Sequence, residues 1–233
     1  MNLKEAKVLV TGGSSGIGLE TARQLAQRGA RVAICGRRAS RVDEAAHSIG
    51  AIGIHGDVSI EDDVARIVKR VIAEFGDYNV LVNNAGYGAF APLAETRLSD
   101  MQRMFATNVF GAMLVARESA RHFIERKGGN IINIASTAGQ RGFAGGTAYV
   151  ASKFALSGMT QCWRTELRHH NIRVMQVNPS EVQTEFFSVA GEARHPSERK
   201  LRPLEIAHAI MALLEMDDRG FVTDATVWAT NPD

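Results

Sequence analysis

Short apolar runs alternate with amphipathic helical patterns along almost the whole chain, and this alternation limits the fold more than any other feature. Apolar runs of 4–8 residues are typical of strands buried on both faces, and helices between them predict parallel crossovers. The expected strands are Lys7–Thr11, Arg31–Gly36, Ile52–His55, Val80–Asn84, Asn130–Ser136, Arg173–Asn178 and Phe221–Trp228. The expected helices are Ile17–Arg28, Ala39–Ser48, Ile60–Phe75, Ser99–Arg126 (with Ser99 as N-cap), Tyr149–His170 and Pro203–Met216. The sequence therefore predicts an α/β fold, a Rossmann-type doubly wound parallel sheet of about seven strands with helices on both faces.

The length and composition favour one domain over two. The chain has 233 residues, of which 45% are hydrophobic and 22% charged, values that suit a globular chain with one large core. No repeat, low-complexity tract or linker divides it, so we expect a single domain over residues 1–233. Its one long irregular stretch, roughly residues 181–202, is a candidate substrate lid.

Several classes of protein are excluded by composition. No apolar run approaches the ~20 residues of a membrane span, and the N-terminus lacks the features of a signal peptide. Net charge is only +2 and the basic pairs are scattered, so nothing indicates a nucleic-acid partner. Cys35 and Cys162 lie in apolar segments and are expected to be buried thiols in a reducing, cytoplasmic compartment. The seven histidines form no metal-binding motif, and no GxSxG motif occurs.

A glycine-rich turn follows the first expected strand and opens the first expected helix. Residues 11–18 read TGGSSGIG. Glycines let the backbone approach a ligand closely, and the free N–H groups of a helix N-terminus attract a phosphate. The spacing is GxxxGxG rather than GxGxxG, and the alternative is a tight turn without a ligand. We expect a cofactor pyrophosphate here, contacted by Gly12, Ser14, Ser15, Gly16, Ile17 and Gly18.

Four motifs in order resemble those of the classical short-chain dehydrogenase/reductase family. The turn matches that family's TGxxxGIG, and Asn83–Gly86 (NNAG) and Tyr149–Lys153 (YVASK) match its NNAG and YxxxK. Ser136 and Asn108 stand where the family places its catalytic serine and asparagine. The resemblance covers nearly the whole chain, and among subfamilies it looks most like the 3-oxoacyl-(acyl carrier protein) reductase group. It implies an oxidoreductase with a nicotinamide cofactor.

The expected chemistry centres on Tyr149 and Lys153, which share one helix face because they are four residues apart. A cation at ~5 Å would favour the phenolate by about 3 kcal/mol, or about two pKa units, with desolvation opposing it. Tyr149 would then exchange a proton with a carbonyl oxygen, and Ser136 would hydrogen-bond that oxygen. The resemblance implies that Lys153 also holds the nicotinamide ribose and that Asn108 serves a water-linked proton relay.

The end of the second strand indicates which cofactor is bound. NAD-binding folds usually carry an acid there, whereas this chain has Arg37 and Arg38, which suit the 2′-phosphate of NADP(H). The alternative is two solvated loop arginines. By the resemblance, the remaining cofactor contacts would be Asp57 and Val58 at the adenine, Asn84, Ala85 and Gly86 along the adenosine and ribose, Pro179 and Val182 near the nicotinamide, and Thr184 at a phosphate or the nicotinamide amide, beside Tyr149 and Lys153. Ser180 replaces the family's usual glycine, and we expect it to change the shape of that loop, because serine tolerates positive φ poorly.

We expect an NADP(H)-dependent carbonyl reductase or alcohol dehydrogenase, with a 3-oxoacyl thioester among the candidate substrates. Residues 90–93, 139–146 and 183–202 would shape the pocket, with Phe143, Phe186 and Phe187 as an apolar wall or as packing residues. An acyl carrier protein would need a basic landing site, for which Arg126, Lys127 and Arg168 are candidates. The resemblance also implies a homodimer or homotetramer. The alternatives are a dehydrogenase of a small hydroxy acid, sugar or alcohol, and a catalytically silent NADP-binding sensor.

Overall fold

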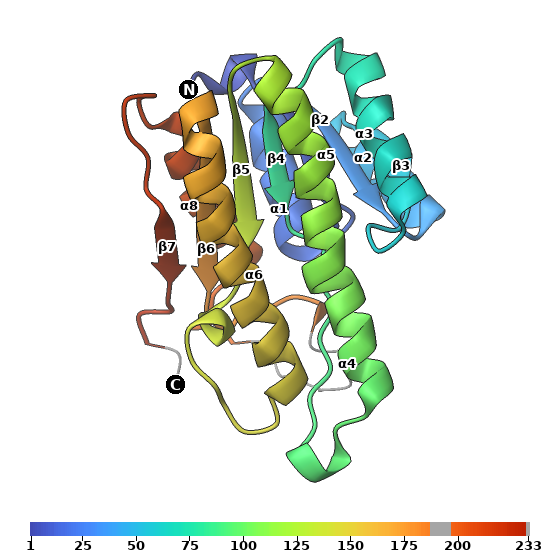
Figure 1. Ribbon diagram of the computed structural model, residues 1–233, viewed down its shortest axis with the longest axis vertical. Coiled ribbons are helices and arrows are strands. Elements are labelled where there is room, and N and C mark those ends of the chain that lie inside the picture. The colour runs from blue at the N-terminus through green and yellow to red at the C-terminus, as the bar shows by residue number, and fades with distance from the viewer. Residues whose placement is uncertain (187–196, 232–233) are drawn as a thin grey trace.

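The computed structural model describes residues 1–186 and 197–231, and it confirms the expected α/β architecture (Figure 1). Seven strands form one sheet in the order β3-β2-β1-β4-β5-β6-β7, and every neighbouring pair is parallel. The strands are β1 (Lys7–Thr11), β2 (Arg31–Gly36), β3 (Ile52–His55), β4 (Val80–Asn83), β5 (Gly129–Ile134), β6 (Ile172–Pro179) and β7 (Asp224–Val227). The central strands β4, β5 and β6 are buried along their whole length, which explains why most of their residues are apolar.

Helices cover both faces of the sheet, as a parallel sheet requires. The helices are α1 (Gly16–Gln27), α2 (Ala39–Ile49), α3 (Glu61–Phe75), α4 (Leu98–Phe105), α5 (Ala112–Glu125), α6 (Thr147–Leu167) and α8 (Pro203–Glu215). Figure 1 shows α3, α5 and α6 in front of the sheet, while α1 packs beside α8 on the opposite face. Successive side chains of β1 point to opposite faces of the sheet. Val8 and Val10 therefore pack with α1 and α8, whereas Leu9 packs with α3 and α5.

The strand order reverses between β1 and β4, and this reversal fixes the place of the binding crevice. The chain runs outward from β1 to β3 and then returns to the other side of β1 as β4. In open parallel sheets, ligands bind beyond the carboxyl ends of the strands at such a switch point. The glycine-rich turn follows β1 and the NNAG segment begins at the end of β4, so both lie at this point.

The long helix expected from Ser99 to Arg126 is interrupted. It consists of α4, a π-helical turn η3 (Ala106–Gly111) and α5. Ser99 is not the N-cap, since α4 begins at Leu98 after Arg97, which makes no side-chain cap. The expected continuous helix did not anticipate this π turn, which changes the hydrogen-bonding register within one helical stretch.

Other expected boundaries differ by a few residues at each end, as is usual for helix and strand termini. The largest differences are β7, which is shorter than Phe221–Trp228, and α6, which begins at Thr147 and ends at Leu167 before a 3₁₀ turn, η5 (Arg168–His170). Further 3₁₀ turns are η1 (Leu3–Glu5), η2 (Leu93–Glu95) and η4 (Thr137–Gly139).

The expectation of two buried thiols is half wrong. Cys35 is fully buried in β2, and burial raises the pKa of its thiol to about 12. Cys162 is exposed on α6, because its position lies on the outer side of that helix.

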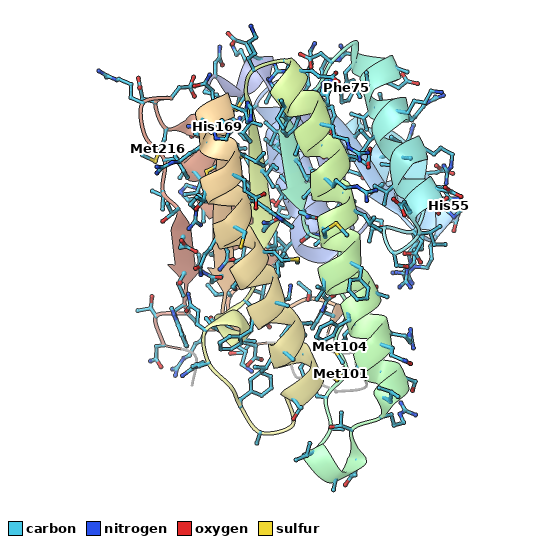
Figure 2. The ribbon with its side chains drawn as sticks, viewed as in Figure 1. His55, Phe75, Met101, Met104, His169 and Met216 are labelled. Carbon is cyan, nitrogen blue, oxygen red and sulfur yellow. The ribbon has the colours of Figure 1, made fainter. Side chains whose placement is uncertain are left out.

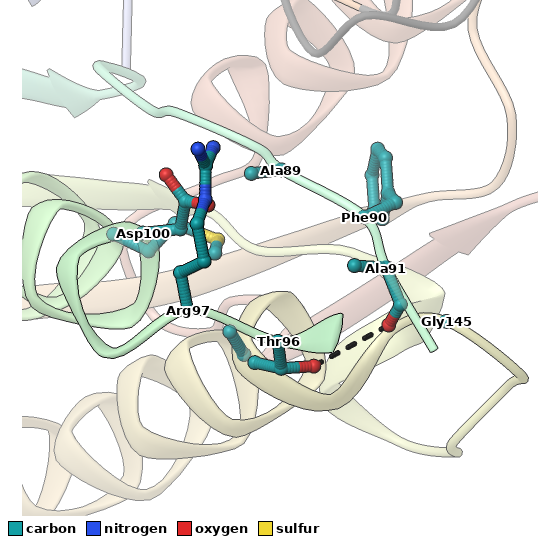
Figure 3. Close-up of a pocket in the computed structure, with 9 residues that line it drawn as sticks. Ala89, Phe90, Ala91, Thr96, Arg97, Asp100 and Gly145 are labelled. Atoms are coloured by element: carbon teal, nitrogen blue, oxygen red, sulfur yellow. Dashed lines mark hydrogen bonds and ion pairs between the residues drawn. The ribbon is translucent and has the colours of Figure 1, made fainter. Parts of the chain in front are cut away.

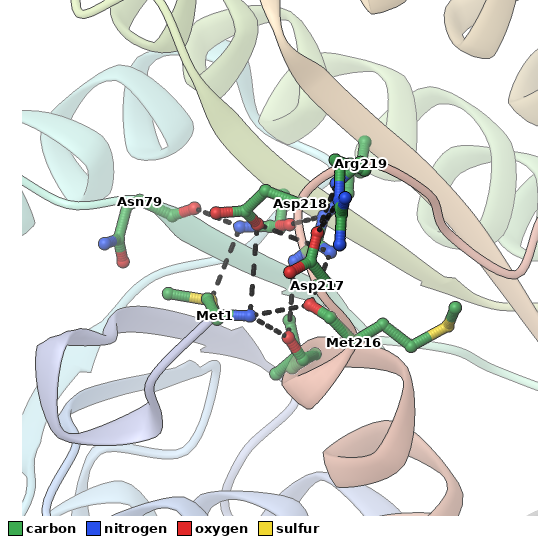
Figure 4. Close-up of polar contacts among 9 residues, drawn as sticks. Met1, Asn79, Met216, Asp217, Asp218 and Arg219 are labelled. Atoms are coloured by element: carbon green, nitrogen blue, oxygen red, sulfur yellow. Dashed lines mark hydrogen bonds and ion pairs between the residues drawn. The ribbon is translucent and has the colours of Figure 1, made fainter.

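At the amino ends of the strands, the end of α8 is fixed by polar contacts (Figure 4). The amino group of Met1 donates to the carbonyls of Leu214 and Met216, each at 2.8 Å. The Arg173 side chain, 8% exposed, donates to the same two carbonyls and to Oδ1 of Asn130 at 2.7 Å. Donors of this kind satisfy the carbonyls that a helix leaves unpaired at its C-terminus. These contacts join α8 to β5 and β6 at the edge opposite to the crevice.

Candidate active site

The glycine-rich turn adopts the conformation that its composition predicts. Gly12 and Gly16 have positive φ, 64° and 54°, which favours glycine over other residues. A Cβ on Gly12 would lie 2.9 Å from the Cα of Ala85, and one on Gly18 would lie 2.5 Å from the carbonyl oxygen of Gly12. The turn therefore folds tightly against the loop that follows β4.

Hydrogen bonds lock these two loops together. The side-chain amide of Asn84 donates to the carbonyls of Thr11 (2.9 Å) and Gly12 (3.2 Å). In the other direction, the backbone N–H groups of Asn84 and Ala85 donate to the Thr11 hydroxyl, both at 3.0 Å. Asn84 thus acts on the shape of the turn through its side chain, a contribution that the motif alone did not reveal.

The turn fits the pyrophosphate of a dinucleotide. Helix α1 starts at Gly16, and its N-cap, Ser15, makes no side-chain hydrogen bond to the helix. The N–H groups of the first turn are thus left for an anion, where the helix dipole also favours negative charge. Thr184 reaches the same place from the loop after β6, because a Cβ on Gly16 would meet its methyl group at 3.3 Å. The expected residues of the turn and Thr184 therefore come together.

The basic residues expected at the ribose lie beyond the end of β2. The Arg37 side chain is 61% exposed, and its guanidinium stands 4.0 Å from the Asp57 carboxylate. Oδ1 of Asp57 accepts from both the backbone N–H (2.9 Å) and the hydroxyl (2.7 Å) of Ser59, so this side chain also shapes the entry to α3. Val58 is buried against Gly111. Arg37 consequently has an open side at which a phosphate could bind.

Ser136, Tyr149 and Lys153 converge at the carboxyl ends of β5 and β6. Ser136 caps η4 by accepting from the Ala138 N–H (3.1 Å), and its hydroxyl also lies 3.4 Å from the Pro179 carbonyl. Lys153 is 5% exposed; its ammonium donates to the Ile134 carbonyl (2.9 Å) and lies 5.8 Å from the centre of the Tyr149 ring. The expected catalytic group is thus brought together by β5, β6 and the first turns of α6.

The electrostatics of this group differ from our expectation. Burial raises the pKa of Tyr149 to about 12, against a smaller lowering by its hydrogen bond with Ser136, and burial lowers the pKa of Lys153 to about 8. The expected lowering of the Tyr149 pKa by the cation is absent, because both groups lose water and desolvation disfavours both charges. Tyr149 is therefore a neutral hydroxyl at pH 7, suited to donate a proton.

Asn108 lies in the π turn and is 1% exposed. Its side chain accepts from the N–H of Tyr87 (2.8 Å) and donates to the carbonyl of the same residue (2.9 Å). It also donates to the hydroxyl of Ser152 (3.0 Å), which in turn donates to the carbonyl of Tyr149 (2.7 Å). The Asn108 side chain therefore fixes the loop after β4 to helix α6, and Ser152 is a link that our sequence reasoning missed. The serine within YVASK was the available signal.

Ser180, at the end of β6, does not adopt a positive φ. Among the described residues, the non-glycine residues with positive φ are Lys127 and Asn171, so Ser180 does not need the conformation of glycine. Its N–H instead donates to the carbonyl of Val227 at 2.9 Å, extending the pairing of β6 with β7. Val182 is buried and pairs with Leu201. Phe187 and much of the expected lid lie outside the described residues.

A small cavity of about 20 Å³ adjoins this group (Figure 3). Phe90, Ala91, Arg97, Asp100 and Gly145 are among the residues that line it. Within residues 1–186 and 197–231, no cluster of histidine, cysteine or acidic side chains suits a metal ion. Across the same residues, no helix has the length and apolarity needed to span a membrane.

Comparisons with known proteins agree with this geometry. Residues 6–195 match the family model described as short chain dehydrogenase. The chain is 34% identical to the human 3-oxoacyl-[acyl-carrier-protein] reductase over 212 residues, which cover 88% of this chain and 90% of that protein. A metagenomic short-chain oxidoreductase in complex with NADP superposes with a TM-score of 0.84 at 33% identity, covering 98% of this chain and 100% of the other. The 3-ketoacyl-(acyl-carrier-protein) reductase from Brucella melitensis, complexed with NADH, gives a TM-score of 0.88 at 28% identity, covering 97% and 98%.

Proposed function

The chain belongs to the short-chain dehydrogenase family, and we propose that it is an NADP(H)-dependent reductase of ketones that uses Tyr149 as its proton donor. The observation that carries this proposal is the neutral, desolvated Tyr149 hydroxyl, hydrogen-bonded with Ser136 and followed four residues later by a buried lysine. A protonated hydroxyl in this position can give its proton to a carbonyl oxygen during reduction and can take it back in the reverse reaction.

The roles of the side chains follow from their positions. The glycine-rich turn and Thr184 would hold the pyrophosphate, Arg37 and Arg38 the 2′-phosphate, and Lys153 the nicotinamide ribose, with Asp57, Val58, Asn84, Ala85, Gly86, Pro179 and Val182 as further contacts. When bound, NADPH supplies a hydride with its electron pair to the carbonyl carbon. Tyr149 gives its proton to the carbonyl oxygen, and Ser136 stabilises the negative charge that develops there. The products are a secondary alcohol and NADP⁺.

The test is NADPH oxidation by the purified protein with a panel of carbonyl compounds, each repeated with NADH. The panel contains a simple ketone, a diketone, a keto sugar and a β-ketoacyl thioester. We expect turnover with NADPH on a neutral ketone. Tight NADPH binding without turnover on any compound would instead support the catalytically silent sensor.

Arg37 provides the prediction for cofactor choice. A charge-assisted hydrogen bond contributes about 1.5–3 kcal/mol, so we expect Arg37→Ala to raise the KM for NADPH about tenfold to a hundredfold and to leave the KM for NADH within about twofold. Initial rates against cofactor concentration measure both constants. Arg70→Ala is the matched control, because Arg70 lies on α3 and its side chain is also 61% exposed. An equal rise in the KM values for NADPH and NADH would contradict the proposal that Arg37 binds the 2′-phosphate.

The cations that we considered as a landing site for an acyl carrier protein lie at the wrong end of the molecule. Arg126 and Lys127 precede β5, and Arg168 follows α6 and precedes β6, so all three lie at the amino ends of the strands. Arg168 stands about 28 Å along the helix from Tyr149. In Figure 2, its neighbour His169 lies at the end of the molecule opposite to Met101 and Met104 of α4. Arg126 is also paired with Asp77 at 3.0 Å. A preference for the β-ketoacyl thioester in the panel would therefore require a different docking surface.

A further inference from the structure

Phenylalanine side chains from separate segments surround the ring of the catalytic tyrosine. Phe90, in the segment after β4, meets Tyr149 edge-on with ring centroids 5.4 Å apart. Phe186, after β6, packs against Tyr149 at 5.7 Å. Phe143, between η4 and α6, extends the cluster by packing on Phe90 at 5.9 Å. All three separations lie in the range in which aromatic rings attract each other.

Two glycines make room for this cluster. A Cβ on Gly88 would lie 2.5 Å from the ring of Phe186, and a Cβ on Gly146 would lie 2.8 Å from the ring of Phe143. Real side chains do not come that close, so any other residue at these positions would displace a ring. The positions of the rings are therefore specified by the surrounding backbone and are not incidental contacts of a loop.

The cavity beside Phe90 is lined by small residues and by one internally neutralised charged pair. Ala89, Ala91, Gly145 and Ala148 line the cavity beside Phe90. The charged residues of that cavity, Arg97 and Asp100, pair with each other at 2.8 Å, and the Thr96 hydroxyl lies 3.1 Å from the Pro92 carbonyl. Phe143 remains 50% exposed although it is a large apolar side chain. An exposed apolar surface beside reacting groups is typical of a binding site.

We propose that the substrate carries an aryl ring next to its reacting carbonyl, and that Phe90 and Phe143 form the surface on which this ring packs. The proposal rests on the ketone reductase function proposed above. A flat ring can stack or meet the phenylalanines edge-on, whereas a saturated ring of the same size fills the space without that geometry. A carboxylate or a sugar would gain little here, because the nearby charged pair is already satisfied and buried polar groups need partners.

The experiment compares two probes that differ in the planarity of one ring. Acetophenone and cyclohexyl methyl ketone have the same carbon skeleton, and we expect kcat/KM with NADPH to favour acetophenone about tenfold. A second readout is independent of turnover: calorimetric Kd values for benzamide and cyclohexanecarboxamide, measured with the full chain and saturating NADP⁺, should differ by a similar factor. Equal or inverted affinities of the two amides would overturn the inference.

Two variants test whether the preference for an aryl ring depends on the aromatic cluster. Phe90→Leu keeps an apolar side chain but removes the ring, and we expect it to reduce the aryl preference to about twofold in both measurements. Phe154→Leu is the matched control, since Phe154 is on α6 beside Lys153 but is 45% exposed and outside the cluster; its aryl preference should stay as in the wild type. An unchanged preference in Phe90→Leu would contradict the role of that ring. Failure of the proposed function has a different signature: the amides would still be discriminated, but no ketone would be reduced.

Discussion

Replacement of Tyr149 by phenylalanine is expected to lower kcat for ketone reduction by about a thousandfold or more. The ring of phenylalanine can keep its contacts with Phe90 and Phe186, but it has no proton to give to the carbonyl oxygen. General acids typically contribute 10²–10⁴-fold, and no described side chain other than Ser136 is hydrogen-bonded to this hydroxyl. Single-turnover NADPH oxidation measures the loss, and calorimetric NADPH binding should remain within about threefold of wild type.

Tyr78→Phe is the control for this result, because it removes a hydroxyl of the same kind far from the crevice. Tyr78 is fully buried and donates to the Ser119 hydroxyl at 2.7 Å. We expect it to lower the free energy of unfolding by about 1 kcal/mol and to leave kcat intact, the reverse of the Tyr149 variant. A Tyr149→Phe protein that turns over ketone at the wild-type rate would rule out Tyr149 as the acid and favour a sensor or a different donor.

Much of the fold could be predicted from sequence because its central strands have no exposed face. Val80–Asn83 and Gly129–Ile134 are buried at every position and carry short runs of valine, leucine and isoleucine that mark them as strands. The π turn at Ala106–Gly111 was not predictable in this way. Within this turn Asn108 hydrogen-bonds to the backbone of Tyr87, a residue 21 positions away, and such a contact is not visible in the local sequence pattern.

The residues proposed to be catalytic could be grouped by motif, but their electrostatics could not be predicted. The spacing of Tyr149 and Lys153 correctly predicts a shared helix face, whereas their pKa values depend on how much water the folded chain removes from each. The aromatic cluster could be predicted only in part from the sequence, for a similar reason. Phe143 and Phe186 were recognised as candidates for a pocket wall, but the contacts of Phe90 with Phe143 and Tyr149 bridge segments that are distant in sequence.

Replacement of Lys153 by methionine is expected to abolish turnover and to stabilise the protein at pH 7. The ammonium is buried without an ion pair among the described residues, and its pKa falls from the ordinary 10.5 to about 8. This corresponds to a cost of about 3 kcal/mol, part of which is offset because methionine leaves the Ile134 carbonyl without its donor. We therefore expect the free energy of unfolding at pH 7, from urea titrations, to rise by about 2 kcal/mol.

The pH dependence of the free energy of unfolding distinguishes removal of the buried Lys153 ammonium from a simple change in packing. Between about pH 8 and 10.5 the unfolded chain binds more protons at Lys153 than the folded chain does, so wild-type stability should rise with pH in that window. Cys35 and Tyr149, whose pKa values are both raised to about 12, act in the opposite direction from about pH 9 and pH 10 upward, so the lysine is isolated by the difference between wild type and Lys153→Met at pH 7 and pH 9.5. From this residue alone, the wild type should gain about 2 kcal/mol between these two pH values, and Lys153→Met should lose that gain.

Lys69→Met, at an exposed lysine of α3, should retain the wild-type dependence on pH. A Lys153→Met protein that is less stable than the wild type at pH 7 would mean that the ammonium stabilises the folded chain, and the account of its burial would be wrong.

The expected gain in stability on replacing Lys153 has a functional reason. An unpaired, desolvated ammonium is costly in the free protein but is well placed to donate hydrogen bonds to the ribose hydroxyls of a bound cofactor. Loss of turnover together with increased stability would show that the residue is kept for binding and catalysis at the expense of the fold.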